Sequence, residues 1–375
     1  MSDAANSVEL LEGKTITGSI SARMLVDNTK YVNFAGCTYL ALGDLPEIRN
    51  AAIDAVQSGQ PFAMQLSPAY GAIDPAFGVV EQAGAKYCGT ESAVYFASGY
   101  LIGLVGLAAL EGVEGPLFID EGAHFSLWDA ARVSGRDLHM FAHCDPNALE
   151  AALKKGLKPG ERPIVITDGA FATTGRVPPL SDYATLIASY DGRILIDEAH
   201  SFGVMGVHGR GAAEHMNVEE VVVSAGTLSK AFCAQGAIYA GDAKTVERLK
   251  MAPPLRGANG GSPISAAVAA AAMRYMMRNG TERRARLAML TAHLRSGIRH
   301  LGIEVVATPA PIVAFSTGTR TQMQQLQRLC FDEGIYLMLS NYTGAGPHGM
   351  FRAAVYADHD KADIDALIDV IRRRC

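Results

Sequence analysis

Short, almost wholly apolar runs alternate with longer amphipathic stretches through the middle of this chain. The runs predict strands at residues 93–97, 116–119, 163–167, 193–196, 221–224 and 236–240. Strands that are apolar on both sides are typical of a parallel sheet that is covered on both faces. The intervening stretches predict helices at residues 100–110, 126–134, 146–155 and 180–190. Strands and helices in alternation indicate an α/β domain with a mostly parallel sheet.

The pattern changes after about residue 250. An alanine-rich stretch, Ser262 to Met277, continues into a charged one, Arg283 to His300, and together they predict a long bridging helix. Strands are then expected at residues 304–307, 311–316 and 351–356, interleaved with helices at residues 321–333 and 361–373. We therefore expect an N-terminal segment (1–40), a large α/β domain (41–252) and a smaller C-terminal α+β domain (253–375).

Composition narrows the class of protein. With 33 basic and 38 acidic residues, the net charge is −5. The chain contains no block of Lys and Arg residues, so we expect neither a nucleic acid nor an anionic membrane as its partner. The chain has neither a signal-peptide pattern at its start nor a run of about 20 apolar residues, so we expect a cytoplasmic protein without a membrane span. Its six cysteines lie far apart with no Cys-x-x-Cys pair, which indicates reduced thiols and no zinc site.

Candidate chemistry lies just after the predicted strands, because ligands of an open parallel sheet bind beyond the carboxyl ends of the strands. Ser98, Gly99 and Tyr100 follow the first strand and open a helix. The free N–H groups of a helix start can bind a phosphate. Taken alone, these residues are more often explained by ordinary helix capping.

Three further candidates follow later strands. His124 follows the second strand, where a histidine is more often a cap or a surface residue. Asp197 ends the strand at residues 193–196, and His200 lies three residues further on. An aspartate in that position is costly to bury without a cationic or proton-donating partner, although it can also simply cap the next turn.

Lys230 lies in the segment Thr227-Leu228-Ser229-Lys230, between small hydroxyl residues and apolar ones. Burial in such a setting favours the neutral amine, which can form a Schiff base, whereas a single lysine is more commonly solvated. Taken together, a phosphate site, an imidazole, a strand-end carboxylate and a buried lysine are what pyridoxal phosphate requires. A nicotinamide cofactor is disfavoured because no G-x-G-x-x-G follows an early strand, and no P-loop is present.

The order of these motifs resembles the α-oxoamine synthases, which are pyridoxal-phosphate enzymes of the aspartate-aminotransferase fold (fold type I). That family includes 8-amino-7-oxononanoate synthase, glycine C-acetyltransferase and serine palmitoyltransferase. The resemblance begins near Asn33, at NFAGCTYLAL, and its most specific stretch is DEAHSFGVMGVHGRG at residues 197–211. Two segments, AHFSLWDAARVSG and FATTGRVPPL, are most similar to the quorum-sensing autoinducer synthases that make α-aminoketones.

The resemblance implies a role for each candidate. Lys230 would hold the cofactor covalently and remove the Cα proton of the substrate. Asp197 would pair with the pyridinium nitrogen, His200 would bind the phenolic oxygen, and His124 would stack on the ring. The phosphate would be held by Ser98, Gly99, Tyr100, Thr227 and Ser229. Arg352, in FRAAVYADHD, would bind the carboxylate of the amino acid, a task that suits the planar guanidinium.

The implied reaction joins an amino acid to an acyl thioester with loss of carbon dioxide, in a homodimer whose active sites are shared. Two alternatives stay open: another reaction on the same cofactor (an aldolase, decarboxylase or aminotransferase), and a non-catalytic protein that retains the fold.

Several positions depart from the family pattern, and they gather around the substrate. Cys37 stands where the family usually has the Asn of N-x-Y-L-G, and Gly103 and Ala172 also replace polar residues. Residues 64–70 (MQLSPAY) replace a glycine-rich loop, and Gly260-Gly261-Ser262 replaces a Ser/Thr-rich turn. We therefore expect intact cofactor residues and an unusual amino acid or acyl donor. That donor is either an acyl-CoA or bound to a carrier protein, or it is absent altogether.

Overall fold

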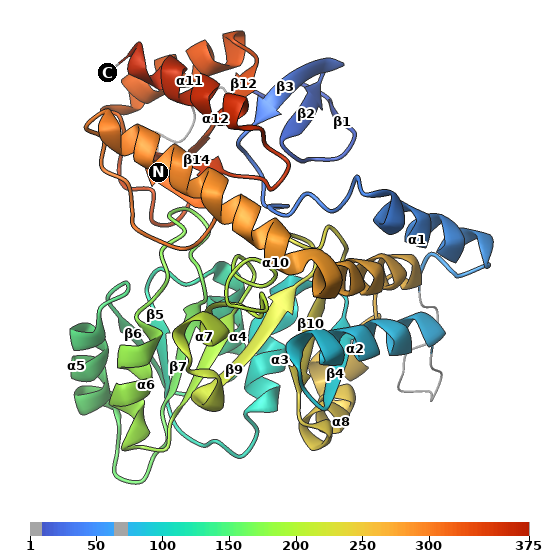
Figure 1. Cartoon of the computed structure of the whole chain (residues 1–375). Helices are drawn as coiled ribbons and strands as arrows, with labels where there is room; N and C mark the ends of the chain where they lie inside the picture. Colours follow the sequence, from blue (N-terminus) through green and yellow to red (C-terminus); the bar gives the residue numbers. More distant parts are fainter. Residues whose placement is uncertain (1–9, 64–73, 375) are drawn as a thin grey trace.

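The computed structural model describes residues 10–63 and 74–374. It has two lobes (Figure 1), a lower one built on a seven-stranded sheet and an upper one that carries both the N-terminal strands and the C-terminal helices. Helix α10 (Pro263–His300) runs between them.

The large sheet has the order β4-β10-β9-β8-β7-β5-β6. Its strands are β4 (Ser92–Phe96), β5 (Leu117–Asp120), β6 (Leu138–Phe141), β7 (Ile164–Asp168), β8 (Arg193–Asp197), β9 (Val222–Thr227) and β10 (Ala237–Gly241). Neighbours from β9 to β6 are parallel, whereas β10 is antiparallel to both β4 and β9. The expected α/β fold with a mostly parallel sheet is confirmed. Of these strands only β6 was not predicted, because this edge strand is half-exposed and carries the exposed Met140.

Helices cover this sheet on both faces, which is why its strands are apolar throughout. In the lower lobe they are α2 (Pro75–Cys88), α3 (Ile102–Ala109), α4 (Phe125–Val133), α5 (Pro146–Gly156), α6 (Leu180–Ala188), α7 (Ala212–Met216), α8 (Ala243–Met251) and α9 (Pro253–Arg256). Every residue of β5 and β7 is buried, and so is β8 after its first residue. Each of these three strands ends on an aspartate, so three carboxylates meet at one edge of the sheet.

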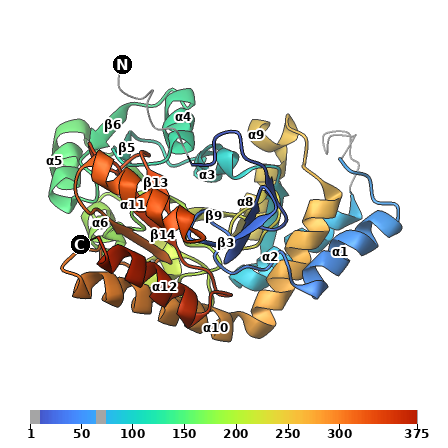
Figure 2. The ribbon, with the colours of Figure 1, turned by 90° about the horizontal axis from the view of Figure 1, so that it is seen from above.

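The bridging helix α10 contains 38 residues and begins with Ser262 as its N-cap and Pro263 in its first turn. It packs against α1 (Pro46–Gln57) and α2 in the lower lobe, and against α12 (Lys361–Arg372) in the upper lobe. Seen from above, α10 runs along the outer side of α12 (Figure 2). The single long helix predicted from the alanine-rich stretch is confirmed. None of the helices in the described ranges is long and apolar enough to cross a membrane.

The upper lobe contains two small sheets. One is antiparallel and consists of β11 (Ile312–Phe315), β14 (Met350–Ala354) and β13 (Met338–Ser340), with α11 (Arg320–Asp332) and α12 packed nearby. The other joins β1 (Ile16–Thr17), β2 (Arg23–Val26) and β3 (Thr29–Asn33) to β12 (Ile335–Tyr336), which is parallel to β3. The expected strand at residues 304–307 is wrong, since these residues form a coil in which Arg299 Nη2 donates to the Val305 carbonyl (3.1 Å).

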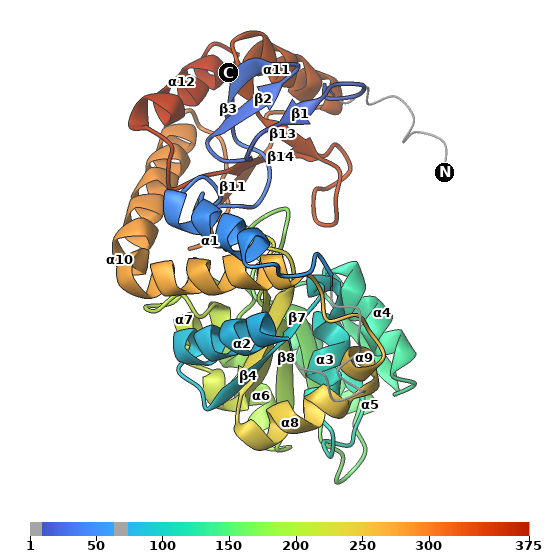
Figure 3. The ribbon, with the colours of Figure 1, turned by 90° about the vertical axis from the view of Figure 1, so that its right-hand side faces the viewer.

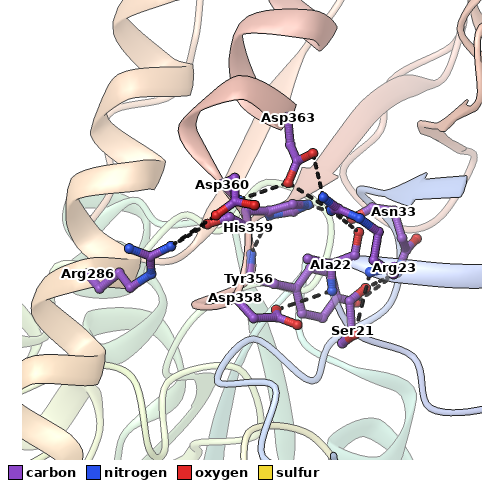
Figure 4. Close-up of polar contacts among 10 residues, drawn as sticks. All are labelled: Ser21, Ala22, Arg23, Asn33, Arg286, Tyr356, Asp358, His359, Asp360 and Asp363. Carbon is purple, nitrogen blue, oxygen red and sulfur yellow. Dashed lines mark hydrogen bonds and ion pairs between the residues drawn. The ribbon is translucent and has the colours of Figure 1, made fainter.

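Polar contacts fasten the N-terminal strands to the C-terminal part of the chain (Figure 4). Arg23 donates from both Nη atoms to the Asp363 carboxylate, at 2.7 and 2.8 Å. The carboxylate of Asp358 accepts the N–H of Ala22 at 3.2 Å. The N-terminal segment is therefore part of the upper lobe, although the chain between residues 34 and 310 separates it from the rest of that lobe.

Candidate active site

Two buried carboxylates lie side by side at the carboxyl edge of the sheet. Asp168 and Asp197 end the neighbouring strands β7 and β8 and are direct partners in the strand register. Asp197 Oδ1 accepts the N–H of Ala199 at 2.8 Å. Burial raises the pKa of Asp197 to about 6, against the lowering effects of the Lys230 charge and of this hydrogen bond. Burial, followed by the charge of Asp197, raises the pKa of Asp168 well above its ordinary value.

Lys230 lies in the turn that follows β9, at the same edge. The expectation of a buried lysine is corrected, because its side chain is only partly buried. Its positive charge nevertheless acts on Asp197, and it also helps to lower the pKa of His124 and of His200, after burial as the main cause in each. The amine thus lies close to all three other groups that were predicted to serve the cofactor.

The predicted phosphate residues gather where β4 and β9 end. Ser98 Oγ accepts the N–H of Tyr100 (3.2 Å) and begins a 3-10 turn, Gly99–Leu101, that leads into α3. A Cβ on Gly99 would lie only 2.7 Å from Thr227 Oγ1, which in turn is 2.9 Å from Ser229 Oγ. Ser98 therefore is a cap, as the simpler interpretation held. The same arrangement also brings N–H groups and two hydroxyls together, as an anion site requires.

His124 is the N-cap of α4. Its backbone N–H donates to Asp168 Oδ2 (2.9 Å), and its ring Nδ1 lies 2.7 Å from Ser126 Oγ. The Asp168 carboxylate, which the sequence pattern did not single out, therefore holds the start of α4 against the sheet.

An aromatic cluster surrounds the His124 ring. The rings of Tyr100 and Tyr342 each lie 6.3 Å from it, and Phe125 lies 5.9 Å from it and 5.3 Å from Tyr342. Tyr342 belongs to the loop between β13 and β14, which reaches down from the upper lobe toward the lower one (Figure 3). Tyr342 was missed because it does not follow an apolar strand, and Phe125, next to His124, was missed because an apolar side chain in a helical stretch gives no sign that it faces a site. All three cluster residues other than His124 are more than a third exposed, as expected for walls of an open site.

Arg352 reaches the site from β14 and is only 4% exposed. Its Nε–H donates to the Ala172 carbonyl (2.5 Å) and its Nη1 donates to the Gly36 carbonyl (2.9 Å). Its Nη2 donates to the hydroxyl of Tyr39 (2.9 Å). That hydroxyl lies 2.7 Å from His200 Nδ1. A continuous chain of hydrogen bonds therefore joins Arg352, which was predicted to bind the substrate carboxylate, to His200, which was predicted to bind the cofactor.

The departures from the family pattern have physical consequences in this structure. Cys37 Sγ lies 3.5 Å from Arg352 Nη2, so a thiol contacts the arginine where the family has an amide. Ala172 holds Arg352 with its backbone and needs no polar side chain for this contact. Gly103 lies where α3 packs on α4, and a Cβ there would approach Ala130 Cβ to 2.7 Å. Gly261, in the turn that departs from the family's Ser/Thr-rich sequence, has a φ of +104° and packs on Tyr95 and Ala97. The other departure, at residues 64–70, lies outside the described residues.

Asp120, His143 and Cys144 form a cluster with metal-ligand atoms within 4.8 Å of one another. One oxygen of Asp120 accepts hydrogen bonds from Gly122 N–H and His143 Nδ1, both at 2.8 Å, and the other accepts from Cys144 N–H (2.9 Å). These contacts fasten the chain after β6 to the end of β5, and we assign the cluster a structural role.

Comparison with known proteins decides the family. The family model of aminotransferase class I and II matches residues 30–371. An 8-amino-7-oxononanoate synthase of Acidithiobacillus ferrooxidans is 33% identical over 91% of this chain and 87% of its own length. The chain belongs to the α-oxoamine synthases. A putative 8-amino-7-oxononanoate synthase of Gloeobacter violaceus is 32% identical to this α-oxoamine synthase, over 95% of this chain and 91% of its own length.

Solved structures share the fold of this α-oxoamine synthase. The serine palmitoyltransferase of Sphingomonas wittichii has a TM-score of 0.88 at 23% identity, covering 98% of this chain and 92% of its own. An 8-amino-7-oxononanoate synthase of Francisella tularensis has a TM-score of 0.75 at 20% identity, covering 92% and 97%. The predicted family and fold are therefore confirmed, and the chain is an enzyme of the acyl-transferring class.

The residues of this α-oxoamine synthase fit pyridoxal phosphate. Asp197 is 4% exposed and forms no ion pair within the described residues, so its carboxylate is free to hold a protonated ring nitrogen. A Cβ on Gly99 would lie 2.7 Å from Thr227 Oγ1 and 2.9 Å from Thr227 Cβ, so a glycine is needed to bring this backbone so close to the Thr227 hydroxyl. The amine of Lys230, a partly buried residue, completes the set of donors and acceptors.

Proposed function

We propose that this chain is a pyridoxal-phosphate-dependent acyltransferase that condenses an amino acid with an acyl thioester, bound to CoA or to a carrier protein. A bond forms between the amino-acid Cα and the acyl carbon, the thioester C–S bond breaks and releases the thiol, and the carboxylate leaves as carbon dioxide. The product is an α-aminoketone. The observation that carries this proposal is the placement of Arg352, which brings a carboxylate-binding guanidinium from the upper lobe to the Tyr39 hydroxyl beside His200.

Each residue has a task that its position supports. Asp197 would bind the ring nitrogen, the His124 ring would lie against one face of the cofactor, and His200 would donate to its phenolic oxygen. Ser98, Gly99, Tyr100, Thr227 and Ser229 would hold the phosphate. Once bound, the cofactor supplies an electron sink that stabilises negative charge on the substrate Cα.

Lys230 and Arg352 would act on the amino acid. The amine of Lys230, once released from the cofactor, would take the Cα proton, and proton transfer by a positioned base contributes about 10²-fold to 10⁴-fold to a rate. Arg352 would orient the substrate through its carboxylate. To grip both carboxylate oxygens the guanidinium must give up one of its present contacts, and the weak Cys37 thiol contact at 3.5 Å is the easiest to displace.

The finer parts of the proposal concern substrate and assembly. The departures at Cys37 and at residues 64–70, together with the similarity to autoinducer synthases, favour a specialised or signalling pathway over cofactor biosynthesis. We also propose a homodimer with shared active sites. Exposed apolar side chains on and after α1 support such an interface, since Ile53, Val56 and Phe62 are about half or more exposed.

A spectral and product assay tests the function. The protein with pyridoxal phosphate should show a visible absorbance band that shifts with one or a few amino acids, and acyl-CoA or acyl-carrier protein should then yield free thiol and carbon dioxide. Lys230→Ala should abolish the covalent band and lower turnover by about 10²-fold or more. Lys244→Ala, which removes an exposed lysine on α8, should change neither.

The outcomes separate the competing reactions. An amino-acid product formed equally with and without the acyl donor would instead identify an aldolase, decarboxylase or aminotransferase. If no band that depends on Lys230 stays with the protein after incubation with pyridoxal phosphate and removal of the unbound cofactor, the fold serves a non-catalytic role.

A further inference from the structure

Tyr39 is completely buried, and its hydroxyl contacts both Arg352 and His200. It comes from the loop between β3 and α1, 161 positions from His200 and 313 from Arg352. The sequence motif around it gave no reason to connect these two residues. We propose that Tyr39 is a positioning residue that fixes the tautomer of His200, so that the proton of the imidazole lies on Nε2 and points to the cofactor. This inference rests on the function proposed above.

The number of hydrogens available to each group decides which atom donates. A guanidinium has donors only, so the 2.9 Å contact from Arg352 Nη2 makes the Tyr39 oxygen an acceptor. The phenol has a single hydrogen left to donate. Because the Tyr39 side chain is shielded from water, that hydrogen needs an acceptor within the protein, and an unsatisfied buried donor costs about 1–3 kcal/mol.

His200 Nδ1 is the acceptor that the geometry offers, at 2.7 Å from the Tyr39 oxygen. The Cys37 thiol is the competing acceptor near Tyr39, and sulfur accepts hydrogen bonds weakly. If Nδ1 instead carried a proton, it and the Arg352 N–H would both donate to the phenolic oxygen, and the Tyr39 hydrogen would be left with the thiol alone.

The charges around His200 agree with a neutral ring. Burial lowers the pKa of His200 well below its ordinary value, and the cationic Lys230 and Arg352 lower it further. A neutral imidazole has one proton, so a proton excluded from Nδ1 resides on Nε2. Nε2–H can then donate to a phenolate oxygen, whereas the other tautomer would present a lone pair to it and repel it.

The test begins with the cofactor-free protein. Nitrogen-15 NMR of the histidine rings, with His200 assigned by its loss in His200→Asn, should show Nε2 protonated and Nδ1 unprotonated. Tyr39→Phe keeps the buried ring but removes the hydroxyl, and it should give a mixture of both tautomers. Tyr183→Phe is the matched control, because Tyr183 is equally buried, lies in α6, and has neither His200 nor Arg352 among the groups that shift its pKa. It should leave the His200 signals unchanged.

A double-mutant cycle on cofactor affinity forms the second arm. Tyr39→Phe should raise the dissociation constant of pyridoxal phosphate about tenfold in the wild-type background, and less than about twofold in the His200→Asn background, since the effect passes through His200. An equal change in both backgrounds, or a wild type protonated on Nδ1, would overturn the proposal. If the wild type fails to bind the cofactor, the proposed function fails, and the NMR arm still decides the tautomer.

Discussion

The burial of one carboxylate at the sheet edge, that of Asp197, lowers the stability of the folded protein. Asp197 is buried beside Asp168, and its pKa is raised to about 6 from an ordinary value of 3.8. Between these two values the folded protein binds more protons than the unfolded one, so this group makes stability fall as pH rises through that window. A shift of this size corresponds to about 3 kcal/mol above pH 6.

We therefore predict that Asp197→Asn stabilises the cofactor-free protein. The Ala199 N–H keeps an oxygen acceptor, and the buried charge is removed. Urea unfolding should show a gain of up to about 3 kcal/mol at pH 8 that shrinks toward pH 4. Asp182→Asn, on the exposed face of α6, serves as the control and should show no such gain. In the presence of pyridoxal phosphate the order should reverse, because the variant loses the partner of the ring nitrogen. A gain independent of pH would contradict the assignment of the effect to this charge.

The sequence allowed the site residues that directly follow apolar strands to be predicted, and it could not reveal the others. Asp197 and Lys230 each come after a recognisable strand, and parallel strands bring their carboxyl ends together. Tyr39 and Tyr342 reach the site from loops of a different lobe, and no local pattern indicates which distant loop will cover a sheet edge. The partial exposure of Lys230 was missed for a similar reason, since burial depends on what packs around the turn.

At the level of helices and strands, close packing of α3 on α4 shapes the wall that carries His124. Gly103 is buried in α3, and a Cβ there would lie 2.7 Å from Ala130 Cβ and 3.2 Å from Leu127 Cδ2. The family's asparagine cannot fit at this distance unless α4 moves away. The absence of that polar group is therefore compatible with the packing of α3 on α4 in this chain.

Gly103→Ala should accordingly destabilise the protein by about 1–3 kcal/mol, because the added methyl forces the helices apart. Gly78→Ala is the matched control. Gly78 is exposed in α2, a Cβ added there would meet no atom within 4 Å, and the substitution should stabilise by about 0.5–1 kcal/mol. Thermal unfolding of both variants measures the difference. Equal stability of the two would show that the α3–α4 contact is looser than described.

Strands were predictable where both faces are buried. β5, β7 and β8 are mostly apolar runs, and this pattern was enough to predict them as strands. β12 and β13 have two and three residues and are partly exposed, so they depend on their partner strands more than on their own composition. Residues 304–307 show the reverse case, in which a strand-like run, Glu304 to Ala307, forms a coil whose Val305 carbonyl accepts from the Arg299 side chain.

At the scale of the whole molecule, the connection between the N-terminal strands and the C-terminal part depends on a buried histidine. His359 Nδ1 accepts the Tyr356 N–H, and its Nε2 lies 3.0 Å from the Asn33 carbonyl (Figure 4). The first contact requires an unprotonated Nδ1, and so a neutral ring, because Nδ1 is the acceptor there. Burial is the main cause that lowers its pKa to about 4. Between pH 6.5 and 4 the unfolded state binds more protons, so this group makes stability fall as pH falls, by up to about 3 kcal/mol.

Asp197 and His359 therefore change the free energy of unfolding in opposite directions over the same pH range. Unfolding measurements on the wild-type protein alone would show only the sum of the two effects. Hydrogen exchange separates them, because the amides of Val32 and Phe34 bond the Gly334 and Tyr336 carbonyls and report directly on the β3–β12 connection. Their protection, corrected for the intrinsic pH dependence of exchange, should fall about tenfold or more from pH 7 to pH 4.5. In His359→Asn protection should be low at both pH values, whereas substitution of the exposed His348 should leave the wild-type pattern intact. Amides of the central strands β7 and β8 should not follow this decline. If they do, protonation unfolds the whole protein and does not act by releasing the N-terminal strands.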